Sequence, residues 1–306
     1  MSIKNLQLVK EFDNLSEMVI NNNKDKLADK MVEKLRVFLK QELFGVWSRN
    51  LLIGQEDDTF ELLRYLAKTD RKGPSFNKNY RTKNFISDHI PELKNNNCLK
   101  NVLTSLFEIK QKGVGAGEVL FSLLLSDVSK PEGKIGDYTY REGNRRIELE
   151  LKALTSAASC KTNSDSRFQF SNDNFERIFK QKKIKGNEQI MNATKEQWHE
   201  YMSGLYPECY EYEKFEAIHK TKDNKEKRQM IGAIGLKRYK EIDNFDSLLA
   251  LKPNEKEGDL EIVCINDFED YDFINKNLSL SPSLYRGRGT QAVGDGYIDI
   301  KYKGGE

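Results

Sequence analysis

The stretch from Gly136 to Lys152 reads GDYTYREGNRRIELELK, and its second half alternates strictly between apolar and charged residues. A period of two is typical of a half-buried strand, because successive side chains point to opposite faces of a sheet. One face would carry Ile147, Leu149 and Leu151, and the other Glu148, Glu150 and Lys152. Residues 141–144 contain Gly143 and predict a hairpin connection to the run that begins at Asp137.

An antiparallel hairpin would carry Asp137 towards the carboxylates of the second strand. Two or three carboxylates on one sheet face suit Mg²⁺, which proteins usually hold by one or two carboxylates together with substrate phosphate and water. Lys152 beside them can orient a water molecule or stabilise charge that develops on phosphorus. The simpler interpretation of residues 148–152 is a surface hairpin with cross-strand charge pairs.

The order of an Asp, a short spacer and Glu-x-Lys on a hairpin resembles the catalytic signature of the PD-(D/E)xK nucleases, which share the restriction-endonuclease-like fold. Asp137 matches the Asp and residues 150–152 match Glu-x-Lys, whereas Gly136 stands in the place of Pro. The resemblance implies that Asp137 and Glu150 are metal ligands, with Mg²⁺ as the cofactor and Mn²⁺ as a substitute. It also implies that Lys152 positions or activates the attacking water.

Upstream, residues 112–125 read KGVGAGEVLFSLLL, a glycine-rich entry into a helix that is apolar on nearly all sides and hence buried. Glu118 stands in the first turn, where the helix dipole favours a carboxylate. Many PD-(D/E)xK nucleases carry an extra acidic residue on this helix, so the resemblance implies that Glu118 is a third catalytic and metal-binding carboxylate. The whole pattern is similar to phage-encoded members. The glycines match neither the dinucleotide-binding fingerprint nor a P-loop.

The composition excludes several classes of protein. The chain has 306 residues, a net charge of +2 and 32% charged residues, which allows one large domain or two with a polar surface. No apolar run approaches the roughly 18 residues of a membrane span, and the first residues lack the apolar segment of a signal peptide. The four scattered cysteines and three histidines support neither a zinc site nor a disulfide framework. We expect a cytoplasmic protein, bacterial or phage-encoded, with a virion location left open.

The chain separates into regions by its pattern. Residues 1–95 predict a helical N-terminal region, and residues 96–306 a nuclease-like domain with a helical insertion at about 175–240. Short strands are expected at 247–252, 260–265, 273–281 and 297–302, the first extending the catalytic sheet. The predicted fold class is α/β or α+β, with a restriction-endonuclease-like core sheet, flanking helices and added C-terminal strands.

Positive charge gathers in three segments, 175–185, 220–228 and 285–289. Such patches near a carboxylate–metal site suit a phosphodiester backbone, although each alone is more often a solvated face. The sequence therefore predicts a Mg²⁺-dependent endonuclease with DNA as its partner, and it leaves a homo-oligomer open. Two alternatives remain: a phage virion or assembly-associated protein that retains a nuclease-like fold, and a non-enzymatic nucleic-acid-binding module.

Overall fold

The computed structural model describes residues 3–27, 29–52, 57–108, 117–130, 136–154, 158–161, 172–180, 187–284, 286–288, 291–293 and 297–303. The chain forms two compact units. Unit 1 comprises residues 1–155 and 245–266, and unit 2 comprises residues 156–244 and 267–306. The division at residue 95 that the sequence pattern predicts stays a prediction.

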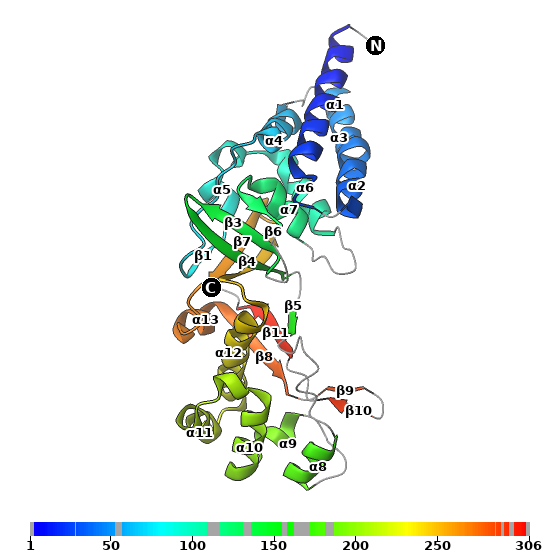
Figure 1. The fold of residues 1–306 in the computed structure, drawn as a ribbon. Coiled ribbons are helices and arrows are strands. Elements are labelled where there is room, and N and C mark those ends of the chain that lie inside the picture. The colour runs from blue at the N-terminus through cyan, green and yellow to red at the C-terminus, as the bar shows by residue number, and fades with distance from the viewer. Residues whose placement is uncertain are drawn as a thin grey trace. The chain divides into compact units, whose positions relative to one another are not determined.

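Unit 1 is built on a six-stranded mixed sheet with the order β1-β7-β6-β4-β3-β2 (Figure 1). Its strands are β1 (Tyr80–Thr82), β2 (Val128–Ser129), β3 (Tyr138–Glu142), β4 (Arg145–Ala153), β6 (Ser247–Asn254) and β7 (Asp259–Ile265). The β4–β6 pair is parallel, and the other pairs in the sheet are antiparallel. Together with the helices, this sheet confirms the predicted mixed α/β class.

The predicted hairpin is formed by β3 and β4, with Tyr138 opposite Leu149 and Glu142 opposite Arg145. Gly143 in the connection has a positive φ of 60°, a backbone conformation that favours glycine. The alternation along β4 is also observed, because Ile147, Leu149 and Leu151 lie in the hydrophobic core of unit 1. This part of the fold follows directly from the period of two.

The helices of unit 1 share one core with that face of the sheet. They are α1 (Ile3–Asn23), α2 (Asp29–Val37), the π-helix η1 (Phe38–Leu43), α3 (Phe44–Leu52), α4 (Asp57–Ala67), α5 (Phe85–His89), the 3₁₀-helix η2 (Pro91–Leu93), α6 (Asn97–Glu108) and α7 (Glu118–Leu124). Phe12 of α1 stacks on Trp47 of α3 with ring centroids 4.9 Å apart. The N-terminal region is thus largely helical, although β1 also falls within it.

Strand β6 extends the sheet beside β4, as predicted for residues 247–252. Glu150 of β4 pairs with Leu248 of β6 in the parallel register. The chain leaves unit 1 after β4 and returns at Phe245, so the crossover between these parallel strands contains most of unit 2. Parallel neighbours require such a crossover, which is usually helical.

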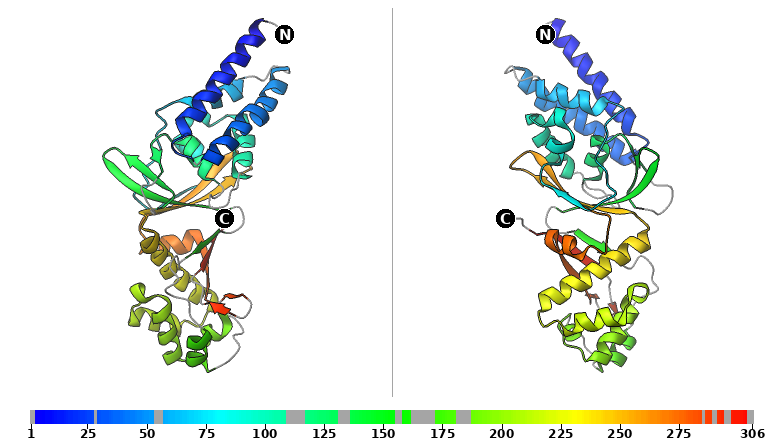
Figure 2. Two further views of the ribbon diagram at one scale, coloured as in Figure 1. Left: turned by 45° about the vertical axis from the view of Figure 1, so that its right-hand side comes forward. Right: turned by 90° about the vertical axis from the view of Figure 1, so that its left-hand side faces the viewer.

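Unit 2 combines helices with a three-stranded sheet of order β5-β11-β8 (Figure 2). Its helices are α8 (Asn172–Phe179), α9 (Asn187–Met191), α10 (Lys195–Leu205), the 3₁₀-helix η4 (Pro207–Cys209), α11 (Tyr212–Lys220), α12 (Asn224–Asp243) and α13 (Tyr271–Asn277). Its strands are β5 (Ala158–Lys161), β8 (Leu278–Ser283), β11 (Tyr297–Tyr302) and the separate pair β9 (Arg286–Arg288) and β10 (Gln291–Val293). The helical character expected for residues 175–240 is observed in their described part.

One strand prediction is wrong in part. Phe273 and Ile274 belong to α13 rather than to a strand, and β8 begins only at Leu278. The cause is the side chain of Asp270, whose Oδ1 accepts a hydrogen bond of 3.0 Å from the backbone N–H of Phe273. An Asp in this position caps the first turn of a helix and so favours helix over strand.

Candidate active site

The register of the β3–β4 hairpin brings Asp137 opposite Glu150. Tyr138 pairs with Leu149. Asp137, which precedes Tyr138, therefore lies opposite Glu150, which follows Leu149. The backbone N–H of Asp137 donates to the carbonyl oxygen of Leu149 at 2.7 Å. Its carboxylate Oδ2 accepts from the backbone N–H of Leu151 at 2.8 Å. Asp137 is therefore held by two hydrogen bonds to the residues on either side of Glu150.

Gly136 makes this attachment sterically feasible. Its φ is +50°, and a Cβ atom at this position would lie 2.6 Å from the carbonyl oxygen of Leu149. That oxygen is the one that accepts the hydrogen bond from Asp137. A side chain at residue 136 would therefore push the two strands apart at the candidate site. This explains physically why the residue before Asp137 is Gly.

Glu150 and Lys152 lie on the same face of β4, as their spacing of two residues requires. The ammonium group of Lys152 donates to Oε1 of Glu150 and forms an ion pair with it. The Glu150 side chain is 7% exposed and the Lys152 side chain 20% exposed. A buried carboxylate needs such a partner, because an unpaired buried charge is strongly destabilising. The structure thus brings together Asp137, Glu150 and Lys152.

Glu118 is the first residue of α7, as predicted. Gly117 before it has a φ of +95°, and a Cβ atom there would contact Leu251 and Ala153 at 3.4 Å and 3.6 Å. The start of α7 therefore packs on the ends of β4 and β6. The hydroxyl of Tyr138 donates to the backbone carbonyl of Glu118 at 3.1 Å, which ties the helix to the hairpin.

Sequence reasoning did not single out Tyr138, which lies between two of the predicted carboxylates. Burial raises its pKa, and the negative charges of Glu118 and Asp137 raise it further. The phenol consequently stays protonated and remains a donor to the backbone of Glu118. In the sequence, an aromatic residue in a strand indicates only core packing, and Tyr138 indeed belongs to the core of unit 1.

The carboxylates of the site can be compared with the ligands that Mg²⁺ prefers. Asp137 and Glu150 supply carboxylate oxygens on neighbouring strand positions, which fits a cation usually held by one or two carboxylates. Among the described residues, no group of three or more His, Cys, Asp or Glu side chains is gathered as a ligand set. The assignment of Glu118 as a third metal ligand therefore stays a prediction.

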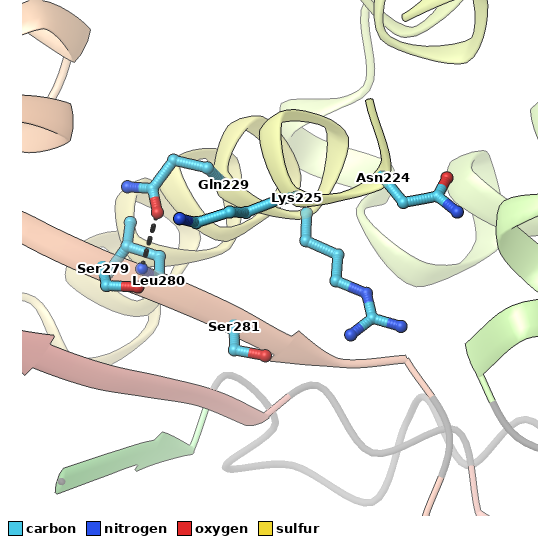
Figure 3. Close-up of a pocket in the computed structure, with 7 residues that line it drawn as sticks. Asn224, Lys225, Gln229, Ser279, Leu280 and Ser281 are labelled. Atoms are coloured by element: carbon cyan, nitrogen blue, oxygen red, sulfur yellow. Dashed lines mark hydrogen bonds between the residues drawn. The ribbon is translucent and has the colours of Figure 1, made fainter. Parts of the chain in front are cut away.

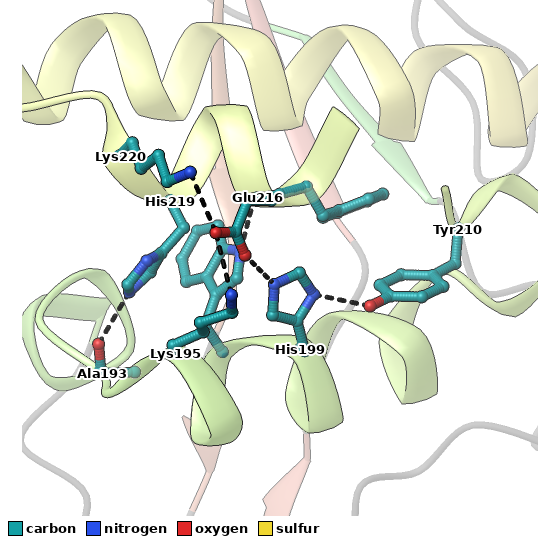
Figure 4. Close-up of polar contacts among 9 residues, drawn as sticks. Ala193, Lys195, His199, Tyr210, Glu216, His219 and Lys220 are labelled. Carbon is teal, nitrogen blue, oxygen red and sulfur yellow. Dashed lines mark hydrogen bonds and ion pairs between the residues drawn. The ribbon is translucent and has the colours of Figure 1, made fainter. Parts of the chain in front are cut away.

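Two of the three histidines make hydrogen bonds that account for their positions. In unit 2, His199 contacts the hydroxyl of Tyr210 through Nδ1 at 2.6 Å and Oε2 of Glu216 through Nε2 at 3.0 Å (Figure 4). His219 contacts the carbonyl of Ala193 through Nε2 at 2.9 Å. The contact with Glu216 joins α10 to α11, and the contact with Ala193 joins α11 to the segment between α9 and α10.

The three basic segments that the sequence shows differ in how much of them the structure describes and in what their side chains contact. The lysines at 182, 183 and 185 lie outside the described residues, as do residues 285 and 289. In the middle segment, Lys220 forms an ion pair of 3.0 Å with Glu216. Lys227 is buried, with Nζ donating to the carbonyl of Met191 at 3.3 Å. This segment is therefore not a uniform basic surface.

Comparisons of the chain with protein-family models, curated proteins and solved structures give no match. Within the described part of the chain, no helix has the length and apolar character needed to cross a membrane.

Proposed function

We propose that this chain is a metal-dependent nuclease that hydrolyses phosphodiester bonds, with DNA as the favoured substrate. The observation that carries the proposal is the attachment of Asp137 to the backbone on both sides of Glu150, with Lys152 in contact with Glu150. These are the three residues for which the resemblance to PD-(D/E)xK nucleases implies catalytic roles.

The topology around the hairpin also supports a restriction-endonuclease-like core. Helix α7 precedes three consecutive antiparallel strands, β2, β3 and β4. A largely helical crossover then leads to β6, which is parallel to β4. The candidate residues lie at the end of β4 where α7 begins, so one short region of the fold contains all of them.

The proposed cofactor is Mg²⁺, with Asp137 and Glu150 as the residues that would hold it. When bound, the cation would lower the pKa of a water molecule and offset negative charge on the phosphate. The chain supplies the orientation of both carboxylates. Asp137 is fixed by the N–H of Leu151, and Glu150 is fixed by its position on a central strand.

Lys152 is a donor and not a metal ligand, because an ammonium group carries only N–H bonds. Its Nζ lies beside Glu150 and within reach of a group bound to that carboxylate. In the proposed mechanism it donates a hydrogen bond to the attacking water or to a phosphate oxygen. Glu118 would support the site from the start of α7, with Tyr138 holding the backbone of that residue.

A cleavage assay with matched variants tests the proposal. Purified protein is incubated with supercoiled, linear and single-stranded DNA, with Mg²⁺, with Mn²⁺ or with excess chelator. Glu150→Gln keeps the size of the side chain but removes its charge, and we expect it to abolish cleavage. Glu148→Gln is the control, because Glu148 lies on the same strand and contacts Thr139 and Arg146 instead.

The proposal requires cleavage by the wild type and by Glu148→Gln in the presence of metal, and none in chelator. Equal activity of Glu150→Gln and Glu148→Gln would refute the assignment of the site. Metal-independent DNA binding without cleavage of any substrate would instead favour the non-enzymatic module.

A further inference from the structure

A cavity of about 330 Å³ lies in unit 2 between α12 and the edge strand β8. Figure 3 shows Lys225 and Gln229 on α12 facing the β8 segment that carries Ser279 and Ser281. The residues that line the cavity are Asn224, Lys225, Arg228, Gln229, Ser279, Leu280 and Ser281. These described residues include two cationic side chains and two hydroxyl groups, and none of them is a carboxylate.

Close to the cavity, α12 is attached to β8 at two consecutive turns. A Cβ atom on Gly232 would lie 2.5 Å from Cβ of Leu280, so the helix touches the strand there. Gln229 fixes the next turn, donating to the carbonyl of Leu278 at 2.9 Å and accepting from the N–H of Leu280 at 2.8 Å. The Gln229 side chain thereby satisfies one backbone carbonyl and one backbone N–H of β8. Lys225 lies four residues earlier, on the same helix face.

Lys225 and Arg228 are the two basic side chains that line the cavity. Within the described part of the chain, neither makes an ion pair, whereas Lys220 pairs with Glu216. Nε of Arg228 is enclosed and, among the described residues, has no hydrogen-bond partner. Buried donors are almost always satisfied, so an unsatisfied one points to a missing acceptor. An oxyanion in the cavity would supply that acceptor.

The charges near the cavity favour an anion. A second cavity, of about 500 Å³, shares Lys225 and Gln229 and is also lined by Lys303. Burial, followed by the positive charge of Lys225, lowers the pKa of Lys303. The carboxylates of Asp223, Glu226 and Asp272 line only this second cavity. Asp223 moreover accepts hydrogen bonds from the N–H groups of Lys225 and Glu226, so the helix terminus itself is occupied.

We propose that the cavity lined by Lys225, Arg228, Ser279 and Ser281 binds a backbone phosphate of a nucleic-acid strand. Arg presents paired N–H donors, Lys a point charge and Ser an O–H donor, which together match phosphate oxygens. Among the described residues of the lining there is no aromatic ring, and Leu280 is the one apolar residue, so they offer a base no ring to stack on. The contact is therefore independent of sequence, as contacts to the backbone are.

The test measures binding of a labelled single strand and a labelled duplex by fluorescence anisotropy in excess chelator, where the proposed cleavage cannot occur. We expect Lys225→Ala/Arg228→Ala to weaken binding roughly tenfold or more at low salt. The slope of log K against log salt should flatten by roughly 0.7 for the single strand and 0.9 for the duplex, the contribution of the one phosphate contact that is lost. Lys220→Ala/Lys222→Ala is the control, because it removes the same charge from outside the cavity.

A second variant distinguishes loss of the phosphate contact from a folding defect in α12. Ser281→Asp places a carboxylate at the cavity without changing α12, and it should weaken binding in the same direction. Inorganic phosphate and a mononucleotide, at the phosphate concentration of the oligonucleotide and matched ionic strength, should not displace the strand. Equal weakening by the control double variant would overturn the proposal, and so would full displacement by either small phosphate.

The outcome is separate from that of the proposed nuclease activity. Asp137→Ala and Glu150→Gln should bind the oligonucleotide in chelator as the wild type does. Two sites with different roles would be established by two results. The hairpin variants would lose cleavage but bind normally, and only the cavity variants would lose binding.

Discussion

Gly136→Ala is expected to destabilise unit 1 more than the same substitution at Gly143, in the same hairpin. Both glycines have a left-handed φ, +50° and +60°, which costs Ala about 1–2 kcal/mol. Both substitutions also gain about 0.4–1 kcal/mol of stability, because Ala reduces the entropy of the unfolded chain. At Gly143 the new Cβ atom would meet nothing within 4 Å, whereas at Gly136 it would lie 2.6 Å from the oxygen of Leu149.

The difference between the two variants isolates the attachment of Asp137. Moving the strands apart would break the hydrogen bonds of 2.7 Å and 2.8 Å that Asp137 makes with Leu149 and Leu151. Each such bond contributes about 0.5–1.5 kcal/mol net. We therefore expect Gly136→Ala to unfold with a free energy about 1–3 kcal/mol lower than that of Gly143→Ala, and to cleave DNA more slowly.

Urea unfolding followed by tryptophan fluorescence can measure this difference. The chain has two tryptophans, Trp47 in unit 1 and Trp198 in unit 2. In a Trp198→Phe background the buried Trp47 reports on unit 1 alone. Linear extrapolation then gives the free energy of unfolding for each variant. Equal losses in Gly136→Ala and Gly143→Ala would refute the steric argument for the residue before Asp137.

Three further outcomes are expected. Hydrogen bonds from His199 and from two lysines lower the pKa of Glu216 to about 2, so its stabilising effect is present above about pH 4.5 and is lost as the pH falls towards 2. Glu216→Gln should then be less stable than the wild type at pH 6 in urea unfolding, with a difference that shrinks towards pH 3. Tyr138→Phe should cost about 0.5–1.5 kcal/mol in thermal unfolding and slow cleavage, because the link to Glu118 is lost. Lys227→Met should leave oligonucleotide affinity unchanged in anisotropy titrations, since Lys227 is buried, and an affinity loss like that of the cavity variants would contradict this structural role.

The hairpin could be predicted from the sequence because the residues that determine it are close together in the chain. The period of two in residues 147–152 specified both the strand and its apolar face, and Gly143 marked the turn. The placement of Asp137 opposite Glu150 follows from a short connection. The same locality explains the start of α7, where glycine precedes an acidic residue and an apolar run.

Features that depend on distant residues were not predictable in this way. Glu150 lies on the face expected to be polar, yet it is 5% exposed, and its neighbour Leu248 on β6 is almost a hundred positions away. Nothing near Glu150 in the sequence indicates that neighbour. Likewise, Lys227 stands in a run of basic residues, and only the packing of α12 decides that it is buried. The short apolar pair 273–274 fits a strand or a helix equally, and Asp270 decides the outcome.

Calorimetric titration of Mg²⁺ and Mn²⁺ into the wild type, Asp137→Ala and Lys152→Ala, with cleavage measured on the same samples, tests the central claim most directly. Asp137→Ala should lose both metal affinity and cleavage, because a carboxylate ligand is removed. Lys152→Ala should lose cleavage while it retains metal binding, because Lys152 is a donor only. Wild-type cleavage that continues unchanged in excess chelator would contradict the mechanism.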